Sequence, residues 1–233
     1  MMALQETDGG PGTFAVEGVA NAPGAVGIVG FSKVFEAVRA HTESPDPIGA
    51  LVARSLNVQS EGTALFAEKV GDKGLAGHFI GSVHITRNLS VAGDITLPNA
   101  DIAEEFPIAD DADVEPGTVM VLTDDEALRP SDHPYDRRVV GIVSGAGTFR
   151  PGLVLDSRRH PSRLPIALLG KVFCKVDAEF GPVAVGDLLA TSPTPGHAMR
   201  ATDPARAFGA VVGKALSKLD SGRGLVPVFA TLQ

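Results

Sequence analysis

The stretch NLSVAGDITLPNADIAEEF, residues 88–106, separates two kinds of sequence in this chain and decides its fold. It begins with two short β-type runs, Leu89–Val91 and Ile95–Leu97, which the turn-forming residues 92–94 separate. Pro98 ends the second run, because proline has no backbone N–H to donate to a strand. A compact acidic cluster follows: Asp101, Glu104 and Glu105. We predict that this stretch joins a repetitive amino-terminal region to a compact carboxy-terminal β domain.

The composition indicates a globular, mainly β protein with few aromatic side chains in its core. Of the 233 residues 44% are hydrophobic and 21% charged, but only 5% are aromatic, and there is no Trp. Such a chain fills its interior with small aliphatic side chains, which suits thin, repetitively stacked sheets. The net charge of −8 argues against a nucleic-acid-binding surface, because phosphate contacts require clustered Lys and Arg. The single cysteine, Cys174, excludes an intrachain disulfide.

The amino-terminal region repeats a pattern in which two small residues flank two others. The pattern recurs with starts about ten to fourteen residues apart, at 27–30, 37–40, 50–53, 64–67 and 74–77. Small residues at fixed positions let backbones approach closely where rungs or chains stack. We therefore predict a flexible segment over residues 1–24 and a β-repeat shaft over residues 25–98.

Two architectures fit this shaft: a single-chain β-solenoid and an intertwined trimeric β-prism. We favour the trimer, because so few rungs without aromatic residues make a poor core for one chain. An ordinary Gly- and Ala-rich β region with chance repeats is a third interpretation. The segment Ser32–Thr42 also fits a short helix capped by Ser32, and the sequence does not decide its conformation.

Residues 99–233 are predicted to form a carboxy-terminal β-barrel or sandwich. The expected strands are Thr118–Leu122, Val139–Ser144, Ile166–Val176, Asp187–Ala190, Gly209–Val212 and Leu225–Leu232. Within 166–176, alternation places Cys174 on an apolar face, so we interpret it as a buried structural thiol. Residues 117–143 and 186–213 also resemble each other, since each runs from a glycine-led strand through a polar hairpin to a glycine-containing strand. Two such units packed together predict a barrel or sandwich.

Most residues with catalytic potential are scattered along the chain. Ser131, Asp132, His133 and Asp136 are residue types that hydrolases use, but the G-x-S-x-G elbow is absent. We interpret this run as a solvated hairpin with Asp–Arg pairs. The remaining candidate ligands, His160 and His197, have no partner at metal-ligand spacing. We therefore expect neither a metal nor a cofactor.

The acidic joint carries a resemblance to a known family. Asp101-Ile102-Ala103-Glu104 resembles the D-Y-A-E segment that opens the self-cleaving chaperone domain (peptidase G2-like) of phage preneck appendage and tailspike proteins. The downstream segments that also fit the family are Gly117–Leu122, Arg138–Ser144, Gly186–Leu189 and Thr194–Gly196. The resemblance spans roughly residues 99–233, and its motifs are short. The glycine-punctuated region before it is similar to the repeats that often precede such domains.

The resemblance implies both an assembly role and a self-cleavage site. In that family the domain helps three chains assemble and then cuts the backbone just before the motif's aspartate, with the glutamate taking part and a serine preceding the bond. Carried over, Glu104 and Asp101 are the catalytic candidates and Ala100–Asp101 is the bond. Ala100 lacks the serine hydroxyl, so an acyl shift through that side chain is impossible, and Ile102 replaces an aromatic residue. A carboxylate-assisted cleavage needs a strained backbone here.

These observations predict a non-enzymatic, homotrimeric structural protein like a tail fibre or tailspike, whose β head drives assembly or binds a target. One alternative is an autoproteolytic endopeptidase that cuts before Asp101, and another is a head that binds a cell-surface glycan or a particle component. Residues 1–8 lack the basic and apolar regions of a signal peptide, and no apolar run approaches the ~20 residues of a membrane helix. We expect cytoplasmic synthesis, then particle association or release after assembly, without membrane insertion or nucleic-acid partners.

Overall fold

The structure, a computed structural model, describes residues 38, 40, 51–54, 63–71, 73–109, 114–158 and 162–231. The chain divides into two units, residues 1–88 and 89–233, and the second contains every strand and helix described here. The predicted flexible segment 1–24 and nearly all of Ser32–Thr42 lie outside the described residues. The first strand begins at Asp101, close to residue 99, where the sequence predicts the β domain to start.

The second unit is mainly β, as the sequence predicts, with little helix. Its elements in chain order are β1 (Asp101–Pro107), β2 (Val119–Leu122), β3 (Leu128–Pro130), β4 (Val139–Val143), β5 (Pro151–Leu155), β6 (Arg163–Asp177), the 3-10 helix η1 (Ala178–Phe180), β7 (Leu188–Thr191), β8 (Ala198–Arg200), α1 (Pro204–Ala207), β9 (Val211–Ala215) and β10 (Arg223–Thr231). The six predicted strands overlap β2, β4, β6, β7, β9 and β10. The sequence analysis does not identify β1, β3, β5 and β8.

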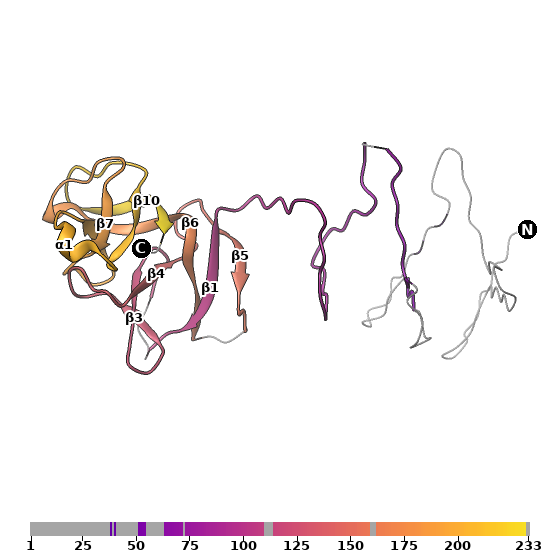
Figure 1. The fold of residues 1–233 in the computed structure, drawn as a ribbon, viewed down its shortest axis with the longest axis horizontal. Coiled ribbons are helices and arrows are strands. Elements are labelled where there is room, and N and C mark those ends of the chain that lie inside the picture. Colours follow the sequence, from indigo (N-terminus) through magenta and orange to yellow (C-terminus); the bar gives the residue numbers. More distant parts are fainter. Residues whose placement is uncertain are drawn as a thin grey trace, which may run out of the picture. The chain divides into compact units, whose positions relative to one another are not determined.

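Five strands close into a barrel in the order β10, β9, β7, β8 and β6 (Figure 1). Antiparallel pairing of β10 with β6 completes it, with Val228 opposite Val172 and Val226 opposite Cys174. Along this half of β6, Val172, Cys174 and Val176 are buried, since alternate side chains of a strand point to the same face. The predicted orientation of Cys174 is therefore confirmed, and burial raises the pKa of its thiol to about 12.

The remaining core strands form a second ring that shares β6 with the barrel. The first half of β6 pairs with β1 and β4, and β2 lies between β4 and β3. A parallel bridge from Ile108, just after β1, to Leu128 of β3 completes this ring. Gly170, with a φ of +114°, pairs with both Asp101 and Ala230, so it lies where β6 passes from one ring to the other.

The two rings are copies of one five-stranded unit, which explains the internal similarity in the sequence. In chain order, β1, β2, β3, β4 and the first half of β6 correspond to the second half of β6, β7, β8, β9 and β10. The glycine before β2 and the glycine before β7 make equivalent hydrogen bonds. Gly117 N–H donates to Val143 O at 2.8 Å, and Gly186 N–H donates to Ala215 O at 2.9 Å.

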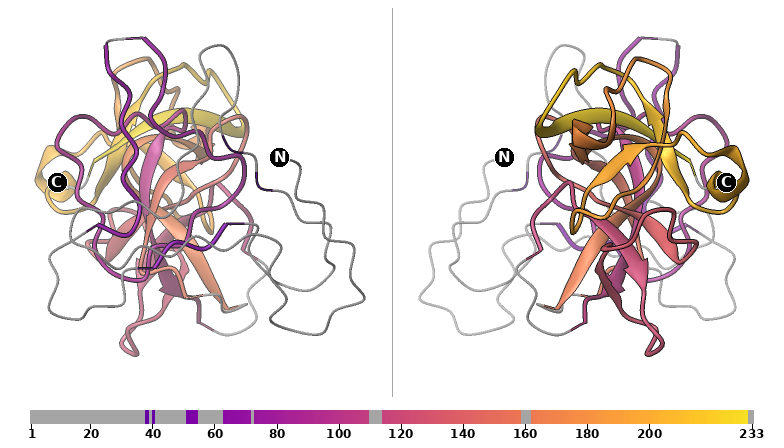
Figure 2. Two further views of the ribbon diagram at one scale, coloured as in Figure 1. Left: turned by 90° about the vertical axis from the view of Figure 1, so that its right-hand side faces the viewer. Right: turned by 90° about the vertical axis from the view of Figure 1, so that its left-hand side faces the viewer.

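Two adjoining clusters of buried aliphatic side chains form the core. The larger contains buried side chains of the barrel together with Val119, Ile142 and Ala167 of the second ring, and the smaller contains Met120, Leu128, Val143 and Ile166. No aromatic side chain of the described residues is fully buried, in agreement with the composition. The short helix α1 contributes no buried residue and lies at the edge of the domain (Figure 2).

Residues 63–71 and 73–98 contain no strand, although the sequence predicts a β-repeat shaft there. Leu89–Val91 and Ile95–Leu97, the two predicted β-type runs, form no strand and pair with no strand among the described residues. A single-chain β-solenoid is likewise not seen among the described residues of the shaft. A β-strand needs a neighbour for its backbone hydrogen bonds, so an intertwined shaft requires other copies of the chain.

Candidate functional site at the start of β1

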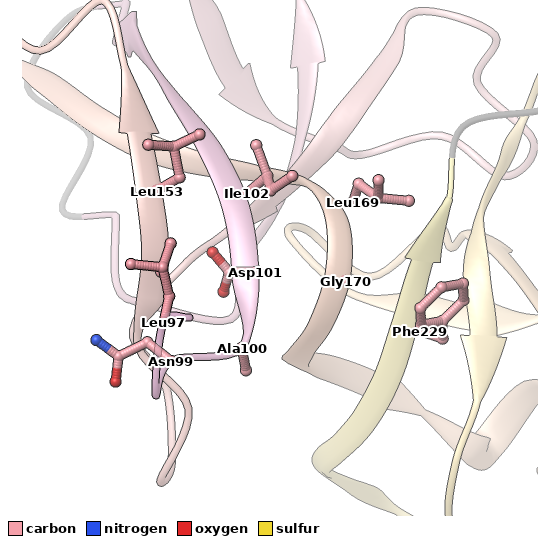
Figure 3. A pocket seen from close by; sticks show the side chains of 10 residues that line it. Leu97, Asn99, Ala100, Asp101, Ile102, Leu153, Leu169, Gly170 and Phe229 are labelled. Atoms are coloured by element: carbon pink, nitrogen blue, oxygen red, sulfur yellow. The ribbon is translucent and has the colours of Figure 1, made fainter. Parts of the chain in front are cut away.

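The chain enters the β domain beside an apolar hollow of about 350 Å³ (Figure 3). The hollow lies over β1, β5, β6 and β10, together with the segment that leads into β1. Its large apolar side chains are each 39–48% exposed: Leu97, Ile102, Leu153, Leu169 and Phe229. Asp101, a predicted catalytic residue, is the one ionisable residue of the lining.

Asp101 is a buried carboxylate with an incomplete set of partners. It is 3% exposed, and Ser144, directly after β4, donates its hydroxyl to Oδ2 of Asp101 at 2.7 Å. The other oxygen, Oδ1, is buried without a hydrogen-bond partner among the described residues. Burial raises the pKa of Asp101 above its usual value, although the hydrogen bond from Ser144 acts in the opposite direction. This carboxyl group therefore holds a proton more readily than an exposed aspartate does.

The predicted scissile bond, Ala100–Asp101, is held firmly on both sides. Ala100 N–H donates to Arg150 O at 3.0 Å, and Lys171 N–H donates to Ala100 O at 3.1 Å. A Cβ at Gly170 would lie 2.5 Å from Ala100 O, so only glycine allows this close approach. Neither Ala100 nor Asp101 has a positive φ, and the strain that cleavage would need is not seen in these dihedral angles.

Glu104, the second predicted catalytic residue, is not joined to the buried pair. It lies on β1 opposite Ile166 and is partly exposed, and no hydrogen bond or ion pair of its side chain occurs among the described residues. The polar partner of Asp101 is instead Ser144, which the sequence analysis did not single out. Ser144 follows an apolar strand and belongs to no motif, so only the packing of β4 beside β6, and of β6 beside β1, reveals it.

The other candidates of the sequence analysis do not form an active site. His133 Nδ1 lies 2.5 Å from Asp132 Oδ1, and Arg129 NH1 lies 2.8 Å from the same oxygen on an exposed loop. The hydroxyl of Ser131 is buried and makes no hydrogen bond to His133 within the described part of the chain. Arg138 also pairs with Asp136, so the predicted Asp–Arg pairs are present, but the segment is not a hairpin, because β3 and β4 on either side of it each pair with β2 and not with each other.

The described residues contain neither a metal-binding cluster nor a membrane-spanning helix. Within these ranges there is no group of three or more His, Cys, Asp or Glu side chains that could hold a metal ion. No helix among them has the length and apolar character that crossing a membrane requires. His197 uses Nδ1 in a 2.8 Å contact with Pro195 O, and His160 lies outside the described residues.

Comparisons with known proteins show a distant similarity to a solved structure. No protein-family model matches the chain, and no curated protein matches it. Among solved structures, the C-terminal fragment of gene product 12 of bacteriophage phi29 is similar, with 13% sequence identity and a TM-score of 0.40. The match covers 56% of this chain and 100% of that fragment.

Proposed function

We propose that this protein is a non-enzymatic structural component of a fibre, a homotrimer whose residues 25–98 associate along a shaft and whose β domain forms the head. One observation carries this proposal: apolar side chains are exposed throughout residues 63–98. The large ones are 45–93% exposed: Leu65, Phe66, Val70, Leu75, Phe79, Ile80, Val83, Ile85, Leu89, Val91, Ile95 and Leu97. The described residues of one chain give this stretch no core.

The physical argument is the free energy that this exposure costs. Burying apolar surface stabilises a protein by roughly 25 cal/mol per Å², and the stretch offers many such side chains without burying them. Its backbone makes no hydrogen bonds to other backbone groups among the described residues. Other copies of the chain could supply both the apolar contacts and the strand partners. The small residues at 64, 67, 74 and 77 would allow three backbones to approach closely at a common axis.

The β domain suits the role of a head, because it has its own core and needs no help from residues 1–88 to bury it. Its two fused rings are closed by strand pairing on both sides of β6. A preformed head attached to each shaft strand would hold the three chains in register at one end. Assembly of a long intertwined stretch is otherwise prone to register slips, since short polar-punctuated strands specify register weakly.

A second candidate function, self-cleavage before Asp101, is favoured by the surroundings of that residue. A buried carboxyl group with a raised pKa, hydrogen-bonded to Ser144, lies next to the bond that joins the stretch 63–98 to the domain. Such a group could donate or accept a proton during peptide hydrolysis. The unstrained backbone and the separation of Glu104 from this pair make us rank self-cleavage below the structural role.

One mass-spectrometry session on the full chain tests both candidates. We expect a native mass three times the denatured mass, with an intact denatured chain. A native mass equal to that of one chain would contradict the trimer. Two denatured fragments that meet between residues 100 and 101, and that disappear in both Asp101→Asn and Glu104→Ala variants, would instead support self-cleavage.

A further inference from the structure

The outer side of β5, β1, β6 and β10 carries a continuous apolar surface, which we call the β1 face. It consists of Leu97, Ile102, Leu153, Leu155, Leu169 and Phe229. All of them except Leu155 line the hollow in Figure 3, and all six side chains are 39–48% exposed. Contiguous apolar surface of this kind on a folded domain is typical of an interface.

The β1 face differs from the rest of this acidic protein in its charge. The chain has a net charge of −8, whereas the hollow is lined by no exposed charged side chain, its one carboxyl group being that of the buried Asp101. Copies with the same net charge repel one another over most of their surfaces. The uncharged hollow is where two copies can approach without that repulsion, whereas charged residues lie at the margin of the face, with Glu104 opposite Leu155 and Lys171 opposite Phe229.

We infer that the β1 face is the surface through which each head packs against a neighbouring copy of this chain. The inference rests on the proposed trimer and adds the head surface that contributes to it. Leu97, at the end of the exposed stretch, and Ile102, on β1, lie five residues apart, which an extended chain spans in about 17 Å. Chains joined along residues 63–98 therefore bring their β1 faces close together, at a high effective concentration.

The edge of the sheet supports a second copy as the occupant. Strand β5 pairs only with β1, in parallel, so its other edge has unpaired backbone groups among the described residues. Two of its side chains, Leu153 and Leu155, belong to the β1 face. A neighbouring copy seated on this face could cover the apolar side chains and this open edge together, which a small apolar ligand in the hollow could not do.

Cysteine labelling of the full chain tests the inference with matched controls. Phe229→Cys and Leu169→Cys lie on the β1 face, whereas Phe180→Cys and Leu216→Cys lie elsewhere on the head at similar exposure, 42% and 48% against 45% and 40%. The native thiol of Cys174 is buried and does not compete. In the assembled protein we expect a maleimide to label the β1-face variants about tenfold more slowly than the controls. The reagent can reach a cysteine in the interface only when the interface opens.

The outcomes separate this inference from the proposed function. If native mass shows a trimer but all four variants react at the same rate, the β1 face is not an interface and the trimer stands. A monomeric wild-type chain would contradict the proposed trimer. If the β1-face variants were still labelled slowly in that monomer, the face would be covered by something other than a second copy, and the inference would be wrong as well. A Phe229→Cys chain that no longer assembles, while the Phe180→Cys chain does, supports the inference.

Discussion

At the scale of single residues, Asp101 is the most unusual group in the protein, because it is a buried acid with one unpaired oxygen. Its folded-state pKa is raised by burial, so the folded protein binds more protons than the unfolded chain over the interval between the two pKa values. The free energy of unfolding should therefore fall as the pH rises through that interval. The variant Asp101→Asn lacks this titration, and its stability relative to wild type should improve steadily with increasing pH.

Urea unfolding followed by tyrosine fluorescence measures this effect in the domain alone, since Tyr135 is the single tyrosine and the chain has no Trp. Asp132→Asn is a control of opposite sign. The hydrogen bond from Arg129 lowers the pKa of Asp132, so this contribution is present at higher pH and is lost as the pH falls through the folded pKa. Parallel pH profiles for wild type and Asp101→Asn would show that Asp101 does not titrate differently in the folded state.

The sequence could locate Asp101 but not its environment. The proline at position 98 and the acidic residues after it mark the joint, because both are local signals. Ser144 lies 43 residues further along, and its hydrogen bond to Asp101 depends on the register of three strands. Such a long-range contact leaves no local pattern, which is why the carboxylate pair inferred from the family resemblance differs from the Asp–Ser pair that the structure contains.

At the scale of elements, a glycine at the same place in each copy is required for ring closure. A Cβ at Gly141 would lie 2.4 Å from Ala167 O, and a Cβ at Gly213 would lie 2.4 Å from Phe229 O. We expect Gly141→Ala and Gly213→Ala each to lower the free energy of unfolding of the domain by about 1–3 kcal/mol, because a carbonyl must move to make room. Chemical denaturation of both variants measures this.

Gly93→Ala is the matched control, because a Cβ there would meet nothing within 4 Å and no positive φ is involved. It should change the stability of the domain by less than about 0.5 kcal/mol. Similar losses at Gly141 and Gly213 would support the equivalence of the two copies. A loss of stability in only one of the two variants would mean that the two rings do not depend on this glycine in the same way.

The sequence predicts six of the strands and misses four, among them the seven-residue β1, for physical reasons. The alternation along Arg163–Asp177 is visible in the sequence, since one face must enter a core. Leu128–Pro130 is three residues long and includes a proline, so it becomes a strand only through pairing with β2 at the edge of the sheet. The sequence of Asp101–Pro107 indicates an acidic cluster and not a strand, because its three carboxylates break the apolar alternation; the segment becomes a strand by pairing with both β5 and β6.

At the scale of the whole molecule, the two parts of the chain differ in whether one copy of the chain can supply their strand pairing and core. Residues 89–233 include a domain that closes its own sheet, and strand patterns within one chain were enough to predict it. Residues 63–98 carry repeats that have no strand partner among the described residues, so neither the repeat pattern nor the single-chain structure defines their conformation. An apolar repeat that finds no partner within the described part of the chain is the feature that connects sequence, structure and the proposed assembly.

Limited trypsin digestion across a dilution series tests whether residues 63–98 become covered when the chains assemble. Lys69, Lys73 and Arg87 are exposed in the single chain, so trypsin should cut there when the protein is dilute and dissociated. At concentrations where native mass gives a trimer, we expect these sites to be cut at least about tenfold more slowly, because proteolysis requires local opening. Lys218, whose side chain is 71% exposed in the domain, should be cut at the same rate throughout and serves as the internal control. Equal cutting at Lys69, Lys73 and Arg87 at every concentration, in a protein that is trimeric by mass, would mean that the chains associate through their heads and that the stretch 63–98 stays open to solvent.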